Sequence, residues 1–157
     1  MPPVDHGVAG PLNDRMHPME RCALDPGFIV FARFAVTAFF AIVFLQSGLN
    51  KVFDSEGNLG FIREHFAGAP MLASNADTLF WSLTVLELLA GVFCGLGLIT
   101  FSFVSGGFFV RWGLRFATLA LLSLLFGQRL AKDYAGAAVV AAYFAVAMLG
   151  FLAFSIH

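Results

Sequence analysis

An apolar run from Phe28 to Leu49 places the strongest constraint on how this chain can fold. Its 22 residues include only two strongly polar ones, Arg33 and Gln46. As an α-helix the run rises about 33 Å, at about 1.5 Å per residue, and the hydrocarbon core of a bilayer is about 30 Å thick. A chain of 157 residues cannot surround several such helices with soluble structure. We therefore interpret this run as a membrane span whose apolar surface faces lipid.

The composition extends this interpretation to most of the chain. Hydrophobic residues make up 59% and charged residues 12%, whereas soluble domains have roughly 45–50% and 25%. We expect one membrane domain over residues 28–157, in contact with the lipid bilayer. Residues 1–27 are polar and rich in proline, and we expect an extended aqueous arm there. The net charge of −1 gives no support to nucleic-acid binding.

Three further apolar stretches are long enough to span a membrane. Residues 79–126 are a stretch of 48 residues with very few charges, about twice the length of one span. We expect this stretch to contain two spans joined by a glycine-rich turn at 102–107. The predicted spans are about 28–49, 79–101, 108–127 and 135–156. The sequence therefore predicts an all-α fold, a four-helix transmembrane bundle with both termini on one side.

The loop between the first two spans predicts a short amphipathic helix. Leu59, Ile62 and Phe66 follow one another at helical spacing, with charged residues between them. This pattern is typical of a helix that lies on a membrane surface or on a bundle.

Small residues at intervals of four predict close packing of two spans. Gly91 and Gly95 lie in the second span. Ala137, Ala141 and Ala145 lie in the fourth.

The distribution of basic residues favours cytoplasmic termini, by five to four. The side of the termini has Arg15, Arg21, Arg33, Arg111 and Arg115. The opposite side has Lys51, Arg63, Arg129 and Lys132. We expect Arg111 and Arg115, one to two turns inside the third span, to extend to the near interface.

Cysteine and histidine positions argue against several cofactors. The histidines lie outside the apolar spans, at positions 6, 17, 65 and 157, so we expect no haem held by two histidines within the membrane. Cys22 and Cys94 form no ligand pair. We expect neither zinc nor an Fe–S cluster, and no covalently bound cofactor.

Polar residues are predicted to gather at the membrane face opposite the termini, where two spans end and two begin. They are Gln46, Asn50, Lys51, Asp77, Gln128, Arg129, Lys132, Asp133 and Tyr134. Gln46 and Asn50 share one helix face, because they are four residues apart.

Glu87 is the residue of greatest interest, because it lies about 12 Å below that face. A carboxylate at this depth should point into the bundle and be paired, hydrogen-bonded or protonated. Its candidate partners are Lys51, Arg129 and Gln46. Two interpretations stay open: a buried polar tie between helices, or a proton-handling or ligand-binding group beside a pocket for a quinone-like head group. Arg33 has the same ambiguity.

Two segments carry a resemblance to a known family. Arg33 followed by FLQSGLNK (Phe44–Lys51), and then LELLAGVFCGLGLIT (Leu86–Thr100), resembles the DoxX-like membrane proteins. The match covers about residues 28–156, although GQRLAKDYAG (Gly127–Gly136) departs from the glycine-rich end that the third span usually has in the family.

The resemblance implies a role in bacterial membrane redox chemistry. The family includes the large subunit of a thiosulfate:quinone oxidoreductase and small membrane subunits linked to redox proteins. We expect an accessory or anchoring subunit of a redox complex in the bacterial cytoplasmic membrane, in contact with other subunits and with quinone or lipid. The alternatives are a catalytic quinone-reducing subunit and a small proton-coupled transporter. The candidate site residues are Arg33, Gln46, Asn50, Lys51, Glu87, Arg129, Lys132 and Tyr134.

Overall fold

The computed structural model describes residues 25–65, 68, 74–100 and 107–155, and within these ranges the chain is all-α. Its helices are α1 (Pro26–Phe53), α2 (Ser55–His65), α4 (Ala76–Ile99), α5 (Phe108–Leu130) and α6 (Tyr134–Ser155). All except α2 are long and apolar enough to cross a membrane. The predicted four-helix bundle is confirmed, and the chain is a multi-pass membrane protein.

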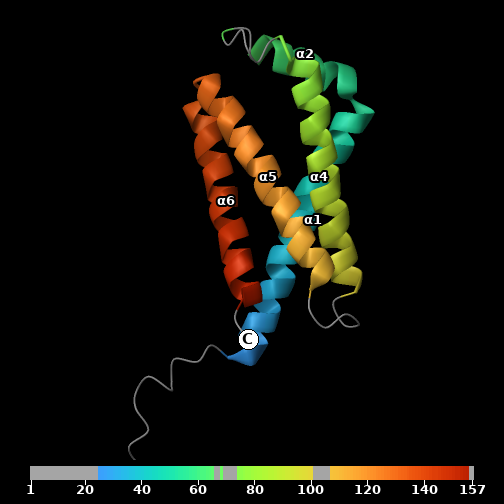
Figure 1. Ribbon diagram of the computed structural model, residues 1–157, viewed down its shortest axis with the longest axis vertical. Coiled ribbons are helices and arrows are strands. Elements are labelled where there is room, and N and C mark those ends of the chain that lie inside the picture. Colours follow the sequence, from blue (N-terminus) through green and yellow to red (C-terminus); the bar gives the residue numbers. More distant parts are fainter. Residues whose placement is uncertain (1–24, 66–67, 69–73, 101–106, 156–157) are drawn as a thin grey trace, which may run out of the picture.

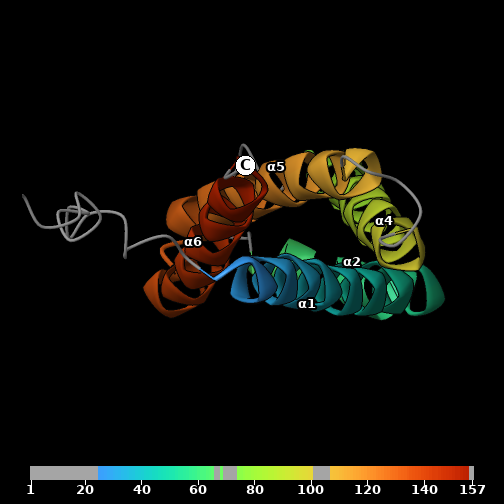
Figure 2. The same cartoon turned by 90° about the horizontal axis from the view of Figure 1, so that it is seen from below.

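The four long helices surround one common core (Figures 1 and 2). The most extensive contacts join α1 to α4 and α4 to α5, and α6 packs on α5 and less extensively on α1. The start of α1 and the end of α6 lie at one end of the bundle, and α2 lies across the other end (Figure 1). The expected topology, with the first span beginning and the last span ending on one side, is therefore present.

The first helix begins earlier and ends later than predicted. Pro26 occupies its first turn, where a missing N–H has no cost, and the Asp25 side chain accepts from the backbone N–H of Gly27 at 3.4 Å. Residues 26–27 are thus helical and do not belong to the expected arm, whose residues 1–24 lie outside the described part of the chain. At its other end α1 extends to Phe53, beyond the apolar run.

The expected turn between the second and third spans is described only at its end. Gly107 precedes α5 with a φ of 59°, a left-handed conformation that glycine adopts without steric cost. Residues 102–106 of that predicted turn lie outside the described residues.

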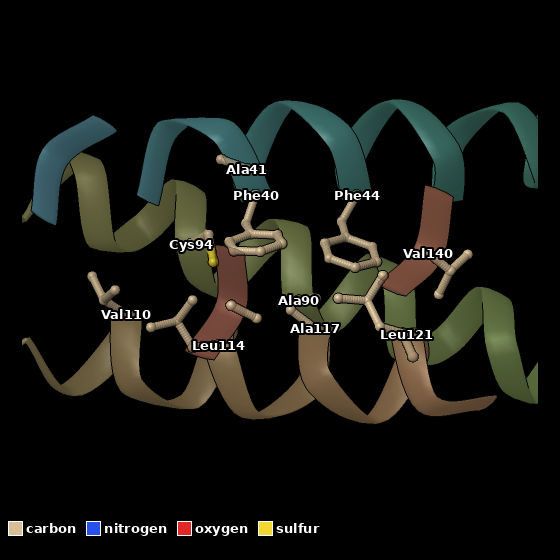
Figure 3. Packing of buried hydrophobic residues seen from close by; sticks show 12 residues of the cluster. Phe40, Ala41, Phe44, Ala90, Cys94, Val110, Leu114, Ala117, Leu121 and Val140 are labelled. Atoms are coloured by element: carbon tan, nitrogen blue, oxygen red, sulfur yellow. The ribbon is translucent and has the colours of Figure 1, made fainter. Parts of the chain in front are cut away.

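The core lies between α1 and α5, with side chains from α4 and α6 closing it (Figure 3). Phe40 and Phe44 point from α1 towards Leu114 and Leu121 of α5. The two phenylalanine rings are stacked, with centroids 5.8 Å apart. Lipid tails are as apolar as these side chains, so the hydrophobic effect does not drive the helices together. The four large side chains stabilise the helix pairing through close dispersion contacts.

Close packing of α1 on α4 depends on Gly91. A Cβ atom at Gly91 would lie 2.7 Å from the backbone nitrogen of Leu45, which is too close for any side chain. At Gly95 the nearest atom, Leu45 Cδ1, would be 3.9 Å away. The prediction of close packing is confirmed at Gly91, whereas at Gly95 there is room for a Cβ atom, so the helix approach there does not require glycine.

The predicted small-residue face of the fourth span is wrong. Ala137 is buried, but Ala141 and Ala145 are exposed. The buried positions of α6 are Ala137, Val140, Ala147 and Gly150. These positions are separated by three and seven residues, the repeat of helices that pack in a left-handed bundle. Residues spaced strictly by four rotate away from the packed face of the helix.

The short helix α2 is present where the loop pattern predicted it. Leu59 and Ile62 are partly buried, and α2 contacts α4 and α1. Phe66, the third residue of the predicted apolar face, lies outside the described residues.

Candidate functional site

Glu87 is buried in the bundle and is bound by two side chains of α1. Its exposed fraction is 1%, and its Oε2 atom lies 2.6 Å from Lys51 Nζ and 2.9 Å from Ser47 Oγ. Lys51 Nζ also donates to Ser47 Oγ at 2.8 Å. The three groups form a closed triangle of charge-assisted hydrogen bonds. The inward orientation of Glu87 and its pairing with Lys51, expected from the energetic cost of a lone carboxylate, are confirmed.

Helix geometry explains how the triangle forms. Ser47 and Lys51 are four residues apart and therefore lie on one face of α1. Gly48 lets that face approach α4, since a Cβ atom there would lie 2.7 Å from Leu88 Cδ2. The approach brings the Glu87 carboxylate within reach of both side chains.

A pocket of about 520 Å³ opens beneath α2, at the end of the bundle opposite the termini. Residues of α1, α2, α4 and α5, with Asp133 of the α5–α6 connection, line it: Lys51, Asn58, Phe61, Ile62, His65, Leu79, Phe80, Leu83, Ser123, Leu124, Phe126, Gly127, Gln128 and Asp133. Its walls are thus mainly aliphatic and aromatic, with a few polar groups. This combination and this volume are typical of sites for small organic ligands.

The polar groups of the pocket come from different elements. Lys51 of α1 and Gln128 of α5 both line it. Gln128 Oε1 is buried and has no hydrogen-bond partner among the described residues. An acceptor in that state costs free energy unless a ligand or water satisfies it. The pocket is therefore lined by the basic side chain of Lys51 and the amide of Gln128 among mainly apolar side chains, and this amide has an acceptor with no partner in the described part of the chain.

His65 and Asp133 lie together at the wall of the pocket. His65 Nε2 and Asp133 Oδ2 are 3.9 Å apart. Asp133 also accepts from the backbone N–H of Gly136 at 2.9 Å, so it caps the start of α6. This contact links α2 to the connection between α5 and α6.

Other predicted site residues lie away from the pocket. Gln46 and Asn50 are exposed. Arg129 is exposed and its guanidinium lies over the Tyr134 ring, 4.9 Å from the centroid. Lys132 is exposed with a φ of 61° in the turn before α6. None of these five residues lines the pocket.

The expected proximity of Gln46 and Arg129 to Glu87 is wrong for a geometric reason. Each residue along a helix is rotated by about 100° from the one before. The inward face of α1 contains Ser47 and Lys51, so Gln46 points elsewhere. Arg129 follows Gln128 by one residue and is directed outward by the same rotation.

Arg33 lies at the opposite end of the bundle and does not contact Glu87 or the pocket. Its Nε atom donates at 2.9 Å to the carbonyl oxygen of Ala153, near the end of α6, and its guanidinium lies 5.5 Å from the Phe154 ring centroid. The structure thus gives Arg33 a packing and capping contact between α1 and α6.

Two exposed charges at the α2 end form a separate pair. Both oxygens of Asp77 accept from Arg63, at 2.7 and 2.8 Å from Nη2. The pair ties α2 to the first turn of α4. Solvent-exposed pairs of this kind contribute little stability.

Sequence reasoning missed Ser47, Ser123 and His65 as residues of these sites. Ser47 had a usable signal, since it precedes Lys51 by four residues and so shares its helix face. Ser123 and His65 had none, because only the tertiary arrangement of α2 and α5 brings them to the pocket.

The described residues contain no group of three histidine, cysteine or acidic side chains that could hold a metal ion. The fold is that of a multi-pass membrane protein, and a mainly apolar pocket lies at the end of the bundle that α2 covers. No protein-family model, curated protein or solved structure matches the chain. The resemblance to the DoxX-like family therefore stays a prediction.

Proposed function

We propose that this chain is a membrane subunit of a bacterial redox complex that binds a quinone-type ring in the pocket beneath α2. The observation that supports this most directly is that Lys51 and Gln128 line the pocket among mainly apolar side chains, and that Gln128 Oε1 has no hydrogen-bond partner among the described residues. A quinone is a flat apolar ring with polar oxygens at its two ends, and it is dissolved in the membrane. Its shape and polarity match this pocket.

The polar groups suit both redox forms of such a ring. Lys51 Nζ uses two of its three protons for Ser47 and Glu87, and the third can be donated to a quinone carbonyl. Rotation of the Gln128 side chain would turn Oε1, which has no partner among the described residues, towards the hydroxyl group of the reduced ring, from which it can accept. Phe80 and Leu83 of α4 and Leu124 of α5 supply apolar contacts for the ring.

The proposed role of Glu87 is to position Lys51. Glu87 does not line the pocket, whereas Lys51 lines it and binds the carboxylate. The carboxylate balances the charge of Lys51 at this depth and fixes the direction of its ammonium group. Glu87 is thus a positioning residue and does not contact the ligand itself.

The accessory role and the location rest on the sequence. The resemblance of Phe44–Lys51 and Leu86–Thr100 to DoxX-like proteins supports a redox assembly in the bacterial cytoplasmic membrane. The five-to-four distribution of basic residues favours cytoplasmic termini, which would place the pocket towards the periplasm.

The first test is extraction of bound small molecules and copurifying subunits after purification in mild detergent. We expect quinone in the extract of the wild type and its loss from Leu83→Trp, where the larger side chain fills the pocket. Val85→Trp is the matched control, because Val85 lies on the same helix, is exposed and does not line the pocket.

Two results would contradict the proposal. One is an extract without quinone from protein that also fails to bind added short-chain quinone. The other is equal quinone content in the two tryptophan variants. Turnover of added quinone by the isolated chain with a reductant would favour the catalytic alternative, whereas turnover only with copurifying subunits supports the accessory role.

A further inference from the structure

We propose a second binding site, at the other end of the bundle, for the phosphate group of an anionic phospholipid. A cleft of about 310 Å³ lies between α5 and α6, lined by Arg111, Arg115, Phe151, Phe154 and Ser155. The site is separate from the pocket beneath α2 and does not depend on the function proposed for that pocket.

The charge of the cleft is positive and unbalanced within the described residues. Arg111 and Arg115 lie four residues apart on one face of α5, and both are exposed. Neither forms a salt bridge with any described carboxylate. Guanidinium groups match the geometry of phosphate oxygens and bind them through paired hydrogen bonds. Two such groups on one cleft favour a phosphate ligand.

The Arg115 side chain is already directed by a neighbouring ring. Its guanidinium lies over Trp112, 4.7 Å from the ring centroid. Stacking leaves the N–H groups at the edge of the guanidinium plane available for an anion. Trp112 itself is an aromatic residue near the start of a span, the usual position at the membrane boundary.

The apolar walls favour a lipid over a soluble phosphate. Phe151 and Phe154 line the same cleft as the arginines. Arg115 lies about 10 Å along α5 from its first residue, Phe108. A phospholipid has both a phosphate and apolar chains at this level of the membrane, whereas inorganic phosphate has no apolar part that could contact the two phenylalanines.

Arg111 has a second contact that affects the choice of variant. Its Nη2 atom lies 3.5 Å from the carbonyl oxygen of Phe154, so it also interacts with the last turn of α6. Arg115 makes no hydrogen bond within the described residues and lines the cleft beside the Trp112 ring. Arg115 is therefore the residue to change first.

The test measures lipid retention in phosphatidylcholine nanodiscs that contain phosphatidylglycerol as a minor component. Native mass spectrometry of the released protein counts the retained lipids. We expect the wild type to retain phosphatidylglycerol, and Arg115→Gln to weaken retention about five-fold, the effect of one basic residue near a membrane surface. Arg115→Lys keeps the charge without the planar fork and should be intermediate.

The matched control is Arg63→Gln, which removes the same charge at the opposite end of the bundle. We expect it to retain phosphatidylglycerol like the wild type. Circular dichroism of each variant establishes that the helices are intact.

Three results would overturn this site. In the first, Arg115→Gln retains as much phosphatidylglycerol as the wild type. In the second, Arg63→Gln lowers retention as much as Arg115→Gln does, which would mean that the net charge of the protein determines retention. Inorganic phosphate could also displace the lipid as readily as added phosphatidylglycerol does, which would identify a site for free phosphate.

Discussion

Lys51 Nζ and Glu87 Oε2 lie 2.6 Å apart and join α1 to α4 at a depth where the rest of the second span is apolar or small. Glu87 is 1% exposed, and the Lys51 side chain is 15% exposed. The carboxylate is therefore shielded from solvent, whereas the Lys51 side chain stays partly exposed and lines the pocket. This difference decides what each substitution should do.

Lys51→Met should destabilise the fold more than Glu87→Leu. The first leaves a buried carboxylate without its cation, a change that costs about 3–5 kcal/mol in buried pairs. The second leaves a lysine that can extend into the pocket. The double variant Lys51→Met/Glu87→Leu should recover most of the loss, because no buried charge remains. Thermal unfolding of the purified variants in detergent measures the cycle.

The exposed pair of Arg63 and Asp77 provides the control for this cycle. Its side chains are 57% and 58% exposed, and Arg63→Met should cost at most about 1 kcal/mol. Equal losses for Arg63→Met and Lys51→Met would mean that the Lys51–Glu87 pair is not buried as described.

Gly91→Ala should destabilise the bundle, by about 1–3 kcal/mol for an overpacked contact. The added methyl group would lie 2.7 Å from the Leu45 backbone nitrogen, and a backbone atom cannot move aside as a side chain can. Gly95→Ala is the control on the same helix, with its nearest neighbour 3.9 Å away. It should be neutral or stabilising, since alanine is the better helix former. Unfolding in SDS ranks the two, and the reverse order would contradict the α1–α4 packing.

Arg33→Met should loosen the end of α6, because it removes the 2.9 Å hydrogen bond from Arg33 Nε to Ala153 O. A hydrogen bond from a charged group contributes about 1.5–3 kcal/mol. Hydrogen exchange of amides in the last two turns of α6 should become faster. Arg115→Met, which removes an exposed arginine that makes no hydrogen bond within the described residues, should leave that exchange unchanged in neutral detergent.

The fold was predictable because span length is a strong physical constraint. A helix that crosses the membrane must satisfy its own backbone and present apolar side chains over about 20 residues. That requirement identified all four long helices. Their ends were less predictable, since capping by Asp25 and the turn at Lys132 depend on local contacts that hydropathy does not report.

The site was predictable only in part. The cost of a buried carboxylate indicated that Glu87 points inward, and it left Lys51, Arg129 and Gln46 as candidate partners. In a helix that is apolar on nearly all sides, however, the sequence does not determine which face is inward. Gln46 was for this reason chosen over its neighbour Ser47, and Arg129 over its neighbour Gln128.

The pocket beneath α2 could not be predicted at all from periodicity. It depends on how α2 lies over the ends of α4 and α5, and residues from distant segments, such as Asn58 and Ser123, meet only there. Sequence reasoning placed Gln128 and Asp133 at the correct membrane face without distinguishing them from the exposed residues beside them.

The most direct test of the quinone pocket is a titration of the purified protein with a short-chain quinone, followed by quenching of tryptophan fluorescence. Trp81 is a suitable reporter, because its ring centroid lies 5.2 Å from that of Phe80, which lines the pocket. The titration compares Gln128→Met with Gln46→Met, which removes an amide of the same size from an exposed position outside the pocket.

We predict that Gln128→Met weakens quinone binding about ten-fold, the effect of losing one hydrogen bond in apolar surroundings. Its stability should not fall, since the substitution removes a buried acceptor that has no partner within the described chain. Gln46→Met should bind like the wild type. Equal affinity of the two methionine variants for the quinone would contradict the proposed site.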